Sequence, residues 1–195
     1  MDLGLEGAAV FVQGGTRGMG RAAAECFAAD GARVAVMGRT KEDVDAAADA
    51  LGSSGAADVI GIPGDIRDDE QVRAAFRTVG ERWGHLNVLV NMAGPDVVGG
   101  IEDLDDDAWV AAFDMGTLGM VRCCRAAIPL LRAAEWGRIV NVSAHSTKRQ
   151  TAHLVAYSAA KSAVTSISKN LSLALAPDEI LVNTCLLYTS PSPRD

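Results

Sequence analysis

A glycine-rich loop directly after the first apolar run is the feature that most restricts the fold of this chain. Residues 8–13 (AAVFVQ) lead into GGTRGMG at 14–20, and an alanine-rich helical pattern follows at once. A strand, a glycine turn and a helix N-terminus in this order present backbone N–H groups, unobstructed by Cβ atoms, at the positive end of the helix dipole. The arrangement favours a bound phosphate. Its GxxxGxG spacing differs from the commonest dinucleotide motif, so a tight turn without a ligand stays an alternative.

The rest of the chain alternates short apolar runs with longer amphipathic ones. The apolar runs predict strands at 8–13, 33–38, 59–63, 88–92, 138–143 and 180–183, and the amphipathic runs predict helices at 18–30, 41–51, 68–83, 105–134 and 157–176. The strand runs are apolar on both faces, which is typical of parallel strands covered by helices on both sides. This alternation predicts an α/β fold of the Rossmann-like type, a doubly wound parallel sheet with right-handed crossovers.

The longest predicted helix carries an acidic start and two internal glycines. Asp105, Asp106 and Asp107 stand where this helix should begin, so we expect a helix cap there rather than a metal site. Gly116 and Gly119 predict a bend or break further along.

Composition narrows the classes of partner. The 195 residues include 18 Lys and Arg against 25 Asp and Glu, a formal charge of −7, and 49% are hydrophobic. The apolar content predicts a packed core, and the acidic balance argues against nucleic acid or an anionic membrane surface as the main partner. No apolar run reaches the roughly 20 residues of a membrane span, and the first residues lack a signal-peptide pattern. Four cysteines without CxxC spacing predict reduced thiols and a cytoplasmic location.

The end of the second predicted strand bears on which dinucleotide the loop would hold. In dinucleotide folds an acid at this strand end binds the 2′-hydroxyl of NAD. Here Gly38 and Arg39 stand at that position, and Arg17 in the glycine loop can reach the same corner. Two guanidinium groups suit a 2′-phosphate, so the sequence favours NADP(H). NAD(H), with both arginines merely solvated, stays an alternative.

Tyr157 and Lys161 form a second candidate constellation. Residues four apart on a helix share one face, and a nearby ammonium and a cofactor cation both favour the phenolate, so we expect Lys161 and the bound cofactor to lower the pKa of Tyr157. Tyr157 then suits general acid or base catalysis at a carbonyl or alcohol oxygen. Ser143 ends a predicted strand at the edge where ligands bind in open α/β sheets, and its hydroxyl can stabilise a developing oxyanion. For the pair alone, a packed tyrosine and a solvated lysine stay an alternative.

Five motifs in chain order resemble the short-chain dehydrogenase/reductase family over residues 5–184. GGTRGMG is similar to the family's TGxxxGxG loop, with Gln13 at the usual threonine. The others are GDI at 64–66, similar to the segment that touches adenine, NMAG at 91–94, similar to NNAG, NVSA at 141–144, similar to the serine-bearing strand end, and YSAAK at 157–161, which matches YxxxK.

The resemblance implies both the catalytic and the cofactor-binding residues. The implied catalytic residues are Ser143, Tyr157 and Lys161, with Lys161 also bonded to the nicotinamide ribose. The implied cofactor-binding residues are Gly14, Thr16, Arg17, Gly18, Met19, Gly20, Arg39, Asp65, Ile66, Asn91, Ala93, Gly94, Tyr157 and Lys161. One position departs from the family pattern, because Gly116 stands where the family has an asparagine that holds a proton-relay water. We expect turnover to survive there through an altered relay, with a water in the freed space.

Residues 185–195 (CLLYTSPSPRD) leave the family pattern and resemble a translated sequencing adapter. We therefore expect one incomplete NADP(H)-binding domain at 1–184, a non-native tail at 185–195, and no counterpart of the family's final strand. Without that strand the sixth strand becomes an exposed edge, so we expect the 195-residue chain to be poorly soluble or inactive.

These observations predict an oxidoreductase that moves hydride between NADP(H) and a ketone or secondary alcohol, similar to 3-oxoacyl-carrier-protein reductases. The alternatives are NAD-dependent alcohol oxidation at the same site and a non-catalytic dinucleotide-binding sensor or partner protein. The expected partner is a small carbonyl or alcohol substrate, and the resemblance implies a homotetramer or homodimer for the full-length form. His145 and His153 flank the loop that should face the substrate.

Overall fold

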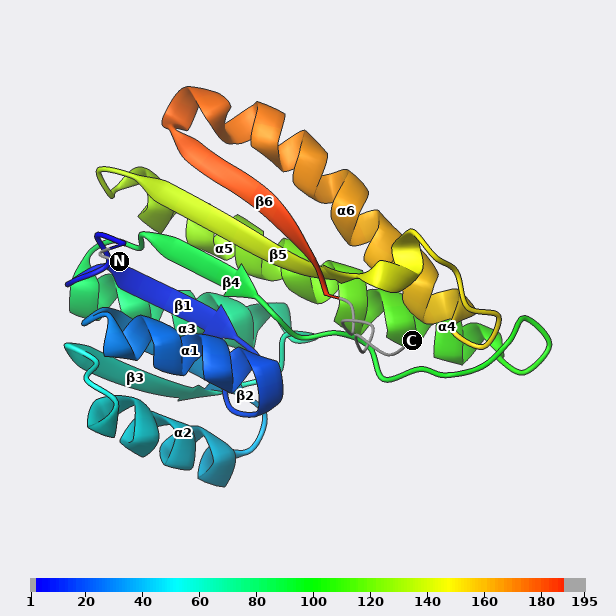
Figure 1. Cartoon of the computed structure of the whole chain (residues 1–195), viewed down its shortest axis with the longest axis horizontal. Helices are drawn as coiled ribbons and strands as arrows, with labels where there is room; N and C mark the ends of the chain where they lie inside the picture. Colours follow the sequence, from blue (N-terminus) through cyan, green and yellow to red (C-terminus); the bar gives the residue numbers. More distant parts are fainter. Residues whose placement is uncertain (1–2, 188–195) are drawn as a thin grey trace, which may run out of the picture.

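A computed structural model describes residues 3–187, which form one six-stranded parallel sheet with helices on both faces (Figure 1). The strands are β1 (Ala9–Gln13), β2 (Arg33–Gly38), β3 (Asp58–Pro63), β4 (Val88–Asn91), β5 (Gly137–Ala144) and β6 (Ile180–Leu187). Their order in the sheet is β3-β2-β1-β4-β5-β6, so the direction of winding reverses between β1 and β4. The predicted doubly wound α/β fold is confirmed, and the reversal marks the point where open sheets bind ligands.

Helices of the two faces pack against alternate side chains of the strands. The helices are α1 (Gly18–Ala29), α2 (Lys41–Ser53), α3 (Asp69–Trp83), α4 (Asp106–Phe113), α5 (Gly119–Arg132) and α6 (Val155–Leu175). Helices α1 and α2 share one apolar cluster with the strands, and helices α3, α5 and α6 share the other. This division follows from the period of two in a strand, which sends successive apolar residues to opposite faces.

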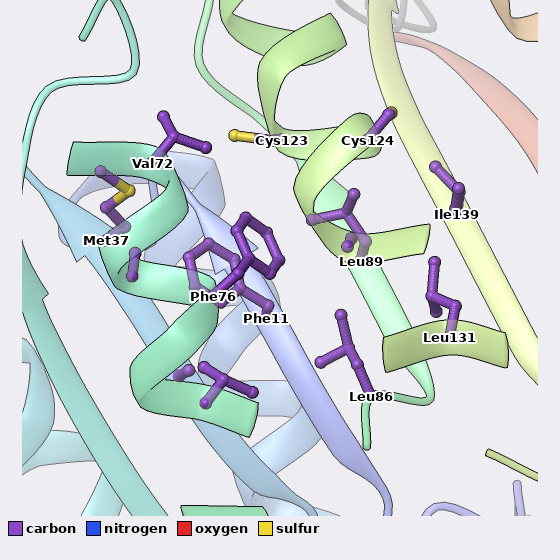
Figure 2. Packing of buried hydrophobic residues seen from close by; sticks show 14 of the residues in the cluster. Phe11, Met37, Val72, Phe76, Leu86, Leu89, Cys123, Cys124, Leu131 and Ile139 are labelled. Carbon is purple, nitrogen blue, oxygen red and sulfur yellow. The ribbon is translucent and has the colours of Figure 1, made fainter. Parts of the chain in front are cut away.

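The larger cluster centres on two stacked rings. The centroids of Phe11 on β1 and Phe76 on α3 lie 4.4 Å apart with an interplanar angle of 21°, and Figure 2 shows the two rings side by side. Cys123 and Cys124 of α5 are buried in the same cluster, and this burial raises the pKa of both thiols. Both cysteines therefore act as core residues and not as nucleophiles.

The long helix predicted at 105–134 is interrupted at its internal glycines, as expected. A π-helical segment, η1 (Asp114–Leu118), separates α4 from α5 and contains Gly116. The start of α4 is capped as expected, because an Asp105 side-chain oxygen accepts a 2.9 Å hydrogen bond from the N–H of Ala108. The acidic run therefore serves the helix N-terminus.

Strand β6 extends further than the sequence predicts. Its parallel register with β5 continues through Cys185, Leu186 and Leu187, three residues past the expected domain boundary at Thr184. The reason is backbone pairing, which continues wherever the neighbouring strand offers free N–H and C=O groups and does not depend on side-chain patterns. In the described part of the chain β6 is an edge strand. The rest of the expected tail, residues 188–195, lies outside the described residues.

Asp58 at the start of β3 predicts how the fold responds to acid. Its carboxylate accepts hydrogen bonds from Arg82 (2.6 and 2.7 Å) and from the indole N–H of Trp83 (2.9 Å), and these donors lower its pKa to about 2. The folded pKa lies below the unfolded value near 3.9, so the stabilisation is present above about pH 4 and is lost as the pH falls towards 2. We expect Asp58→Asn to lower the free energy of unfolding by about 1 kcal/mol at pH 7, the exposure of Arg82 reducing the effect.

The measurement is urea unfolding of both proteins at pH 7 and at about pH 2.5. The difference between them should shrink in acid, and an equal difference at both pH values would contradict the charge-based explanation. Asp45→Asn is the matched control, because Asp45 forms only an exposed pair with Lys41 on α2. We expect that substitution to change the stability by less than about 0.5 kcal/mol.

Candidate active site

A cleft of about 360 Å³ opens at the carboxyl end of the sheet, between the loops that follow β1, β2, β3 and β4. It brings together every predicted cofactor-binding residue except Asn91, Tyr157 and Lys161. The predicted residues that line it are Gly14, Thr16, Arg17, Gly18, Met19, Gly20, Arg39, Asp65, Ile66, Ala93 and Gly94.

The glycine loop forms a cradle that side chains would fill. Gly14 has a φ of 75°, a left-handed conformation that favours glycine. A Cβ on Gly20 would overlap the carbonyl oxygen of Gly14, so the first turn of α1 packs directly on the loop. The N-cap of α1, Arg17, makes no side-chain cap hydrogen bond, which leaves the first N–H groups of the helix available to an anion. The residues present therefore fit the pyrophosphate of a dinucleotide.

The end of β2 leaves no room for an acidic side chain. A Cβ on Gly38 would lie 2.5 Å from Cγ2 and 2.9 Å from Oγ1 of Thr16, so any side chain there would displace Thr16. Arg17 and Arg39 are exposed in the cleft and form no ion pair with other described residues. Two arginines without an ion pair among the described residues thus line the cleft into which the second strand leads.

Two acidic residues also line this cleft. Asp65 is bound to Arg67, whose guanidinium, with a smaller effect from Arg39, lowers the pKa of the Asp65 carboxyl. Asp43 lies in the first turn of α2 and was not predicted from the sequence. The position of Asp43 in the cleft depends on how α2 packs against the sheet, and no local sequence pattern predicts that packing.

Gln13 joins two of the loops that form the cleft. Its side-chain carbonyl accepts hydrogen bonds from the N–H groups of Met92 (3.1 Å) and Ala93 (2.9 Å), and the residue is only 3% exposed. The sequence marked Gln13 only as a departure from the family's threonine. The structure gives it a positioning role, because its amide holds the loop after β4 beside the glycine loop.

Asn91 lies behind the cleft and does not line it. Its amide donates a 2.8 Å hydrogen bond to Asn141, its register partner on β5, and the amide of Asn141 donates to Ser168 of α6 at 2.8 Å. Asn91 therefore links β4 to β5, and it does not line the cleft as the implied cofactor contact would require. The side-chain nitrogen of Asn91 is thus paired, whereas its side-chain oxygen has no hydrogen-bond partner among the described residues.

Lys161 and Tyr157 lie on one face of α6, one turn apart, and face different spaces. Lys161 is 3% exposed, and its Nζ donates to the carbonyl oxygens of Val142 (2.8 Å) and Ala93 (3.4 Å). A Cβ on Gly94 would lie 3.0 Å from this Nζ, so the lysine packs against the wall of the cofactor cleft. Tyr157 is half-buried and lines a second pocket of about 730 Å³.

Burial shifts both titratable groups of this helix. It lowers the pKa of Lys161 to about 8 and raises the pKa of Tyr157 above its usual value of about 10. The expectation that Lys161 lowers the pKa of Tyr157 is therefore wrong for this structure. The physical reason is that the Nζ of Lys161 is directed to two backbone carbonyls and loss of hydration dominates at the phenol.

Ser143 points away from both pockets. It is 2% exposed, and its hydroxyl donates to the carbonyl oxygen of Lys161 at 2.8 Å and accepts from the hydroxyl of Thr165 at 3.2 Å. The next residue along the strand, Ala144, lines the pocket of Tyr157 instead. Because successive strand residues point to opposite faces, a shift of one residue turns the serine into the interface between β5 and α6.

The pocket of Tyr157 adjoins the cofactor cleft. Ala93 and Gly94 line the cleft and Pro95, the next residue, lines the pocket, so the two share the loop after β4. Of the two histidines that flank the loop expected to face the substrate, His145 lines the pocket and His153 does not. The residues that line it are Pro95, Asp96, Val97, Val98, Ala144, His145, Ser146, Arg149, Leu154, Tyr157 and Leu187.

Comparison with known proteins agrees with this architecture. The family model described as short chain dehydrogenase matches residues 8–191. The chain belongs to the short-chain dehydrogenase family. It therefore falls among NAD(P)-dependent oxidoreductases, and its relatives are named as oxidoreductases, dehydrogenases and reductases. Residues of the chain are 32% identical to the uncharacterized oxidoreductase YvrD of Bacillus subtilis, over 95% of this chain and 70% of that protein.

Further relatives extend the range of substrates in the family. The chain is 33% identical to a 3beta-hydroxysteroid dehydrogenase of Mediterraneibacter gnavus, over 89% of this chain and 63% of that protein. L-sorbose reductase from Gluconobacter frateurii, complexed with NADPH and L-sorbose, superposes with a TM-score of 0.91 at 28% identity, over 94% of this chain and 70% of that one. A 3-ketoacyl-ACP reductase from Sinorhizobium meliloti 1021 superposes with a TM-score of 0.86 at 32% identity, over 90% and 70%.

The chain thus spans about two thirds of the length of these relatives. Within residues 3–187, no helix is long and apolar enough to cross a membrane, and no group of three metal-ligating side chains occurs.

Gly116, the departure from the family pattern, has no space for a side chain. A Cβ there would lie 2.8 Å from Cδ of Pro95 and 3.2 Å from Cβ of Ala160. The proline ring therefore fills the position next to the helix that an asparagine side chain would need. The space beside Gly116, in which we expected a relay water, is therefore partly filled by Pro95.

We expect Gly116→Ala to lower the free energy of unfolding by about 1–3 kcal/mol, because the added methyl group overpacks a rigid contact. Thermal unfolding checks this, and the cost should be smaller in a Pro95→Ala background because the two sites are coupled. Gly52→Ala on α2 is the matched control, because a Cβ there meets nothing within 4 Å. Equal losses at Gly116 and Gly52 would contradict the steric explanation.

Proposed function

We propose that this site interconverts a ketone and a secondary alcohol with NADP(H). The observation that carries the proposal is the position of two residues on one face of α6. Lys161 packs against the wall of the dinucleotide cleft, and Tyr157, one turn earlier, presents its phenol to the adjoining pocket. A substrate carbonyl in that pocket would lie between the phenol and the cleft, which is the geometry that hydride and proton transfer to one C=O group requires.

Each residue has a chemical role in this proposal. Bound NADPH supplies a hydride to the carbonyl carbon. Tyr157 keeps its proton at neutral pH because burial raises its pKa, so it is the acid that protonates the carbonyl oxygen during reduction. Lys161, charged below its pKa of about 8, would donate a hydrogen bond to the ribose of a bound cofactor. The N-terminus of α1 binds the pyrophosphate.

The test has a binding arm and a turnover arm. Calorimetric titration of the chain with NADPH and with NADH measures cofactor affinity without requiring turnover. Consumption of NADPH or NADH with a panel of 3-oxoacyl thioesters, steroid ketones, ketoses and aliphatic ketones then measures hydride transfer. Tight NADPH binding with turnover supports the proposal, preference for NADH supports NAD-dependent oxidation, and binding without any turnover supports a non-catalytic sensor.

The preference for NADP(H) rests on the end of β2. Thr16 closes the position that an acid would need, and Arg17 and Arg39 leave two free cations in the cleft. The relative solved with NADPH, L-sorbose reductase, supports the same cofactor class. The acid Asp43, in the first turn of α2, lines the same cleft and works against a phosphate there.

We expect Arg39→Ala to weaken NADPH binding by about 10- to 100-fold, the value of a charge-assisted hydrogen bond, while NADH affinity stays within about twofold. Calorimetric titration with both cofactors measures the change. Arg77→Ala, which removes an exposed arginine paired with Glu70 on α3, should alter neither affinity. Equal weakening of both cofactors by Arg39→Ala would show that the guanidinium does not select the 2′-phosphate.

The wider biological setting is part of the same proposal. We propose 3-oxoacyl thioesters as the first substrates to test, because a relative of this class superposes closely. A homodimer or homotetramer is proposed for the full-length form, supported by an apolar groove between α5 and α6 that includes Val121, Ile128, Ile167 and Leu171. A reducing, cytoplasmic location is proposed because the thiols of Cys123 and Cys124 are free and buried.

A further inference from the structure

Three arginines differ from all the others within residues 3–187. Every other arginine in this part of the chain donates to a carboxylate, a backbone carbonyl or an imidazole. Arg17, Arg39 and Arg149 have no side-chain partner among the described residues, and each of them lines one of the two pockets at the carboxyl edge of the sheet. An acidic chain that pairs its other arginines and leaves these three unpaired in pockets offers them to an anionic ligand.

The cofactor accounts for only two of these arginines. Arg17 and Arg39 line the dinucleotide cleft, where the proposed 2′-phosphate would bind them. Arg149 does not line that cleft, and it lines the pocket of Tyr157 instead. The ligand that would pair with Arg149 is therefore the compound that occupies this second pocket, which is the substrate.

The turn that carries Arg149 is fixed to the end of β5. The carbonyl oxygen of His145 accepts hydrogen bonds from the N–H groups of Lys148 (2.8 Å) and Arg149 (3.0 Å). The hydroxyl of Thr147 donates a 2.9 Å hydrogen bond to the carbonyl oxygen of Ala144, the last residue of β5. The backbone below Arg149 is thus held in place, whereas its side chain is exposed at the pocket. An anion can therefore reach the guanidinium without any rearrangement of the turn.

The rest of the pocket limits what else this substrate carries. Its volume of about 730 Å³ exceeds what a small ketone needs, and side chains such as Val97 and Leu154 give it an apolar lining. Its other charged residue is Asp96, which forms no ion pair with Arg149. Asp96 repels an anion, so the anionic group belongs next to the arginine. The pocket thus suits a ketone with an apolar body and one anionic end.

We propose that Arg149 binds a carboxylate or phosphate group of a ketone substrate whose carbonyl lies beside the phenol of Tyr157. This inference rests on the proposed carbonyl reduction and adds the class of substrate. A guanidinium donates two parallel N–H···O hydrogen bonds to either group. Arg149 exchanges no proton in the reaction. Its contact is made away from the reacting carbon and is equally strong before and during hydride transfer, so it acts on KM and not on kcat.

The experiment compares anionic ketones with neutral counterparts of the same shape. The pairs are an oxo acid with its methyl ester, and a 3-oxoacyl-coenzyme A with the corresponding N-acetylcysteamine thioester. Arg149→Gln should raise KM for the anionic member of a pair by about tenfold, the value of a hydrogen bond to a charged group at a partly screened position. The values of kcat, and KM for the neutral member, should stay within about twofold.

Two further variants separate a specific contact from general electrostatics. Arg149→Lys keeps the charge and loses the planar fork, so its KM for the anionic ketone should lie between those of the wild-type chain and Arg149→Gln. Lys148→Gln removes a neighbouring exposed cation that lines neither pocket, and it should leave every KM within about twofold. An effect in the oxo-acid pair alone identifies a carboxylate as the ligand, and an effect in the coenzyme A pair alone identifies a phosphate; either supports the proposal.

A binding measurement does not depend on turnover. Calorimetric titration of the oxo acid into the chain saturated with NADP⁺ should show affinity about tenfold weaker in Arg149→Gln than in the wild-type chain. Added salt should reduce this difference, because ions screen an exposed charge pair. NADPH affinity should be the same in both proteins, since Arg149 lies outside the dinucleotide cleft.

Three results would overturn the assignment. These are a ratio of KM between the anionic and neutral ketones that Arg149→Gln leaves unchanged in both pairs, an equal change caused by Lys148→Gln, or a fall in kcat at constant KM. Failure of the proposed function looks different, because no ketone of either kind would then be reduced, whereas binding of the oxo acid would still depend on Arg149.

Discussion

Tyr157→Phe lowers kcat for carbonyl reduction by about 10²- to 10⁴-fold and leaves NADPH affinity within about twofold of the wild-type value. The substitution removes one hydroxyl and keeps the ring, so the pocket wall that the tyrosine forms stays in place. What is lost is the acid that protonates the carbonyl oxygen, and general acid catalysis is worth this much. Cofactor affinity is preserved because Tyr157 does not line the dinucleotide cleft.

The measurement is steady-state turnover with the best substrate, together with calorimetric titration of NADPH and the thermal unfolding midpoint. Because burial raises the pKa of Tyr157, its phenol keeps its proton between pH 6 and pH 9. We therefore expect no change in the rate of reduction from titration of Tyr157 in this range. An unchanged kcat in the phenylalanine variant would remove the proton-donor role. Equal loss of NADPH affinity would indicate damage to the fold instead.

Lys161→Met removes at least about 99% of kcat/KM for NADPH while the free energy of unfolding at pH 7 stays equal or rises by about 1 kcal/mol. Burial lowers the pKa of this lysine to about 8, below the unfolded value near 10.4. The folded state therefore disfavours the ammonium. This penalty is complete below pH 8, shrinks as the pH rises from 8 to 10.4, and is absent above it. Methionine removes this penalty, but it also removes the two hydrogen bonds that Nζ donates. The net gain in the free energy of unfolding is therefore small.

Activity and urea unfolding of Lys161→Met are measured between about pH 6 and pH 10. The wild-type kcat/KM for NADPH should fall above about pH 8, as Lys161 loses the proton that the cofactor ribose requires, and the methionine variant should show no such fall. Lys169→Met, at an exposed position of the same helix, is the matched control and should behave as the wild-type chain does. A large loss of stability in Lys161→Met at every pH would mean that the lysine serves mainly to hold the loop after β4.

The fold and the dinucleotide cleft could be predicted because their signals are local. Apolar runs and helical periodicity place all six strands and the main helices within a few residues, since side chains facing a core must repeat with the period of the element. The glycines between Gly14 and Gly20 mark the cradle, because no other residue fits that backbone geometry and close packing. Tyr157 and Lys161 share a helix face for the same local reason.

The details of the site depend on contacts between segments far apart in the sequence. Gln13 bridges to Ala93, Pro95 fills the space beside Gly116, and Lys161 bonds to carbonyls rather than to Tyr157. Such contacts follow from how loops and helices pack, and packing sets both the direction of a hydroxyl and the hydration of a titratable group.

By itself the sequence determined the sheet of parallel strands, the glycine cradle and the pairing of Tyr157 with Lys161 on one helix, because backbone conformation and periodicity are encoded residue by residue. Only the tertiary structure decided that the hydroxyl of Ser143 turns away from the pocket of Tyr157. One residue of strand position separates the hydroxyl of Ser143, buried against α6, from Ala144 in the pocket wall, because successive strand residues point to opposite faces of the sheet.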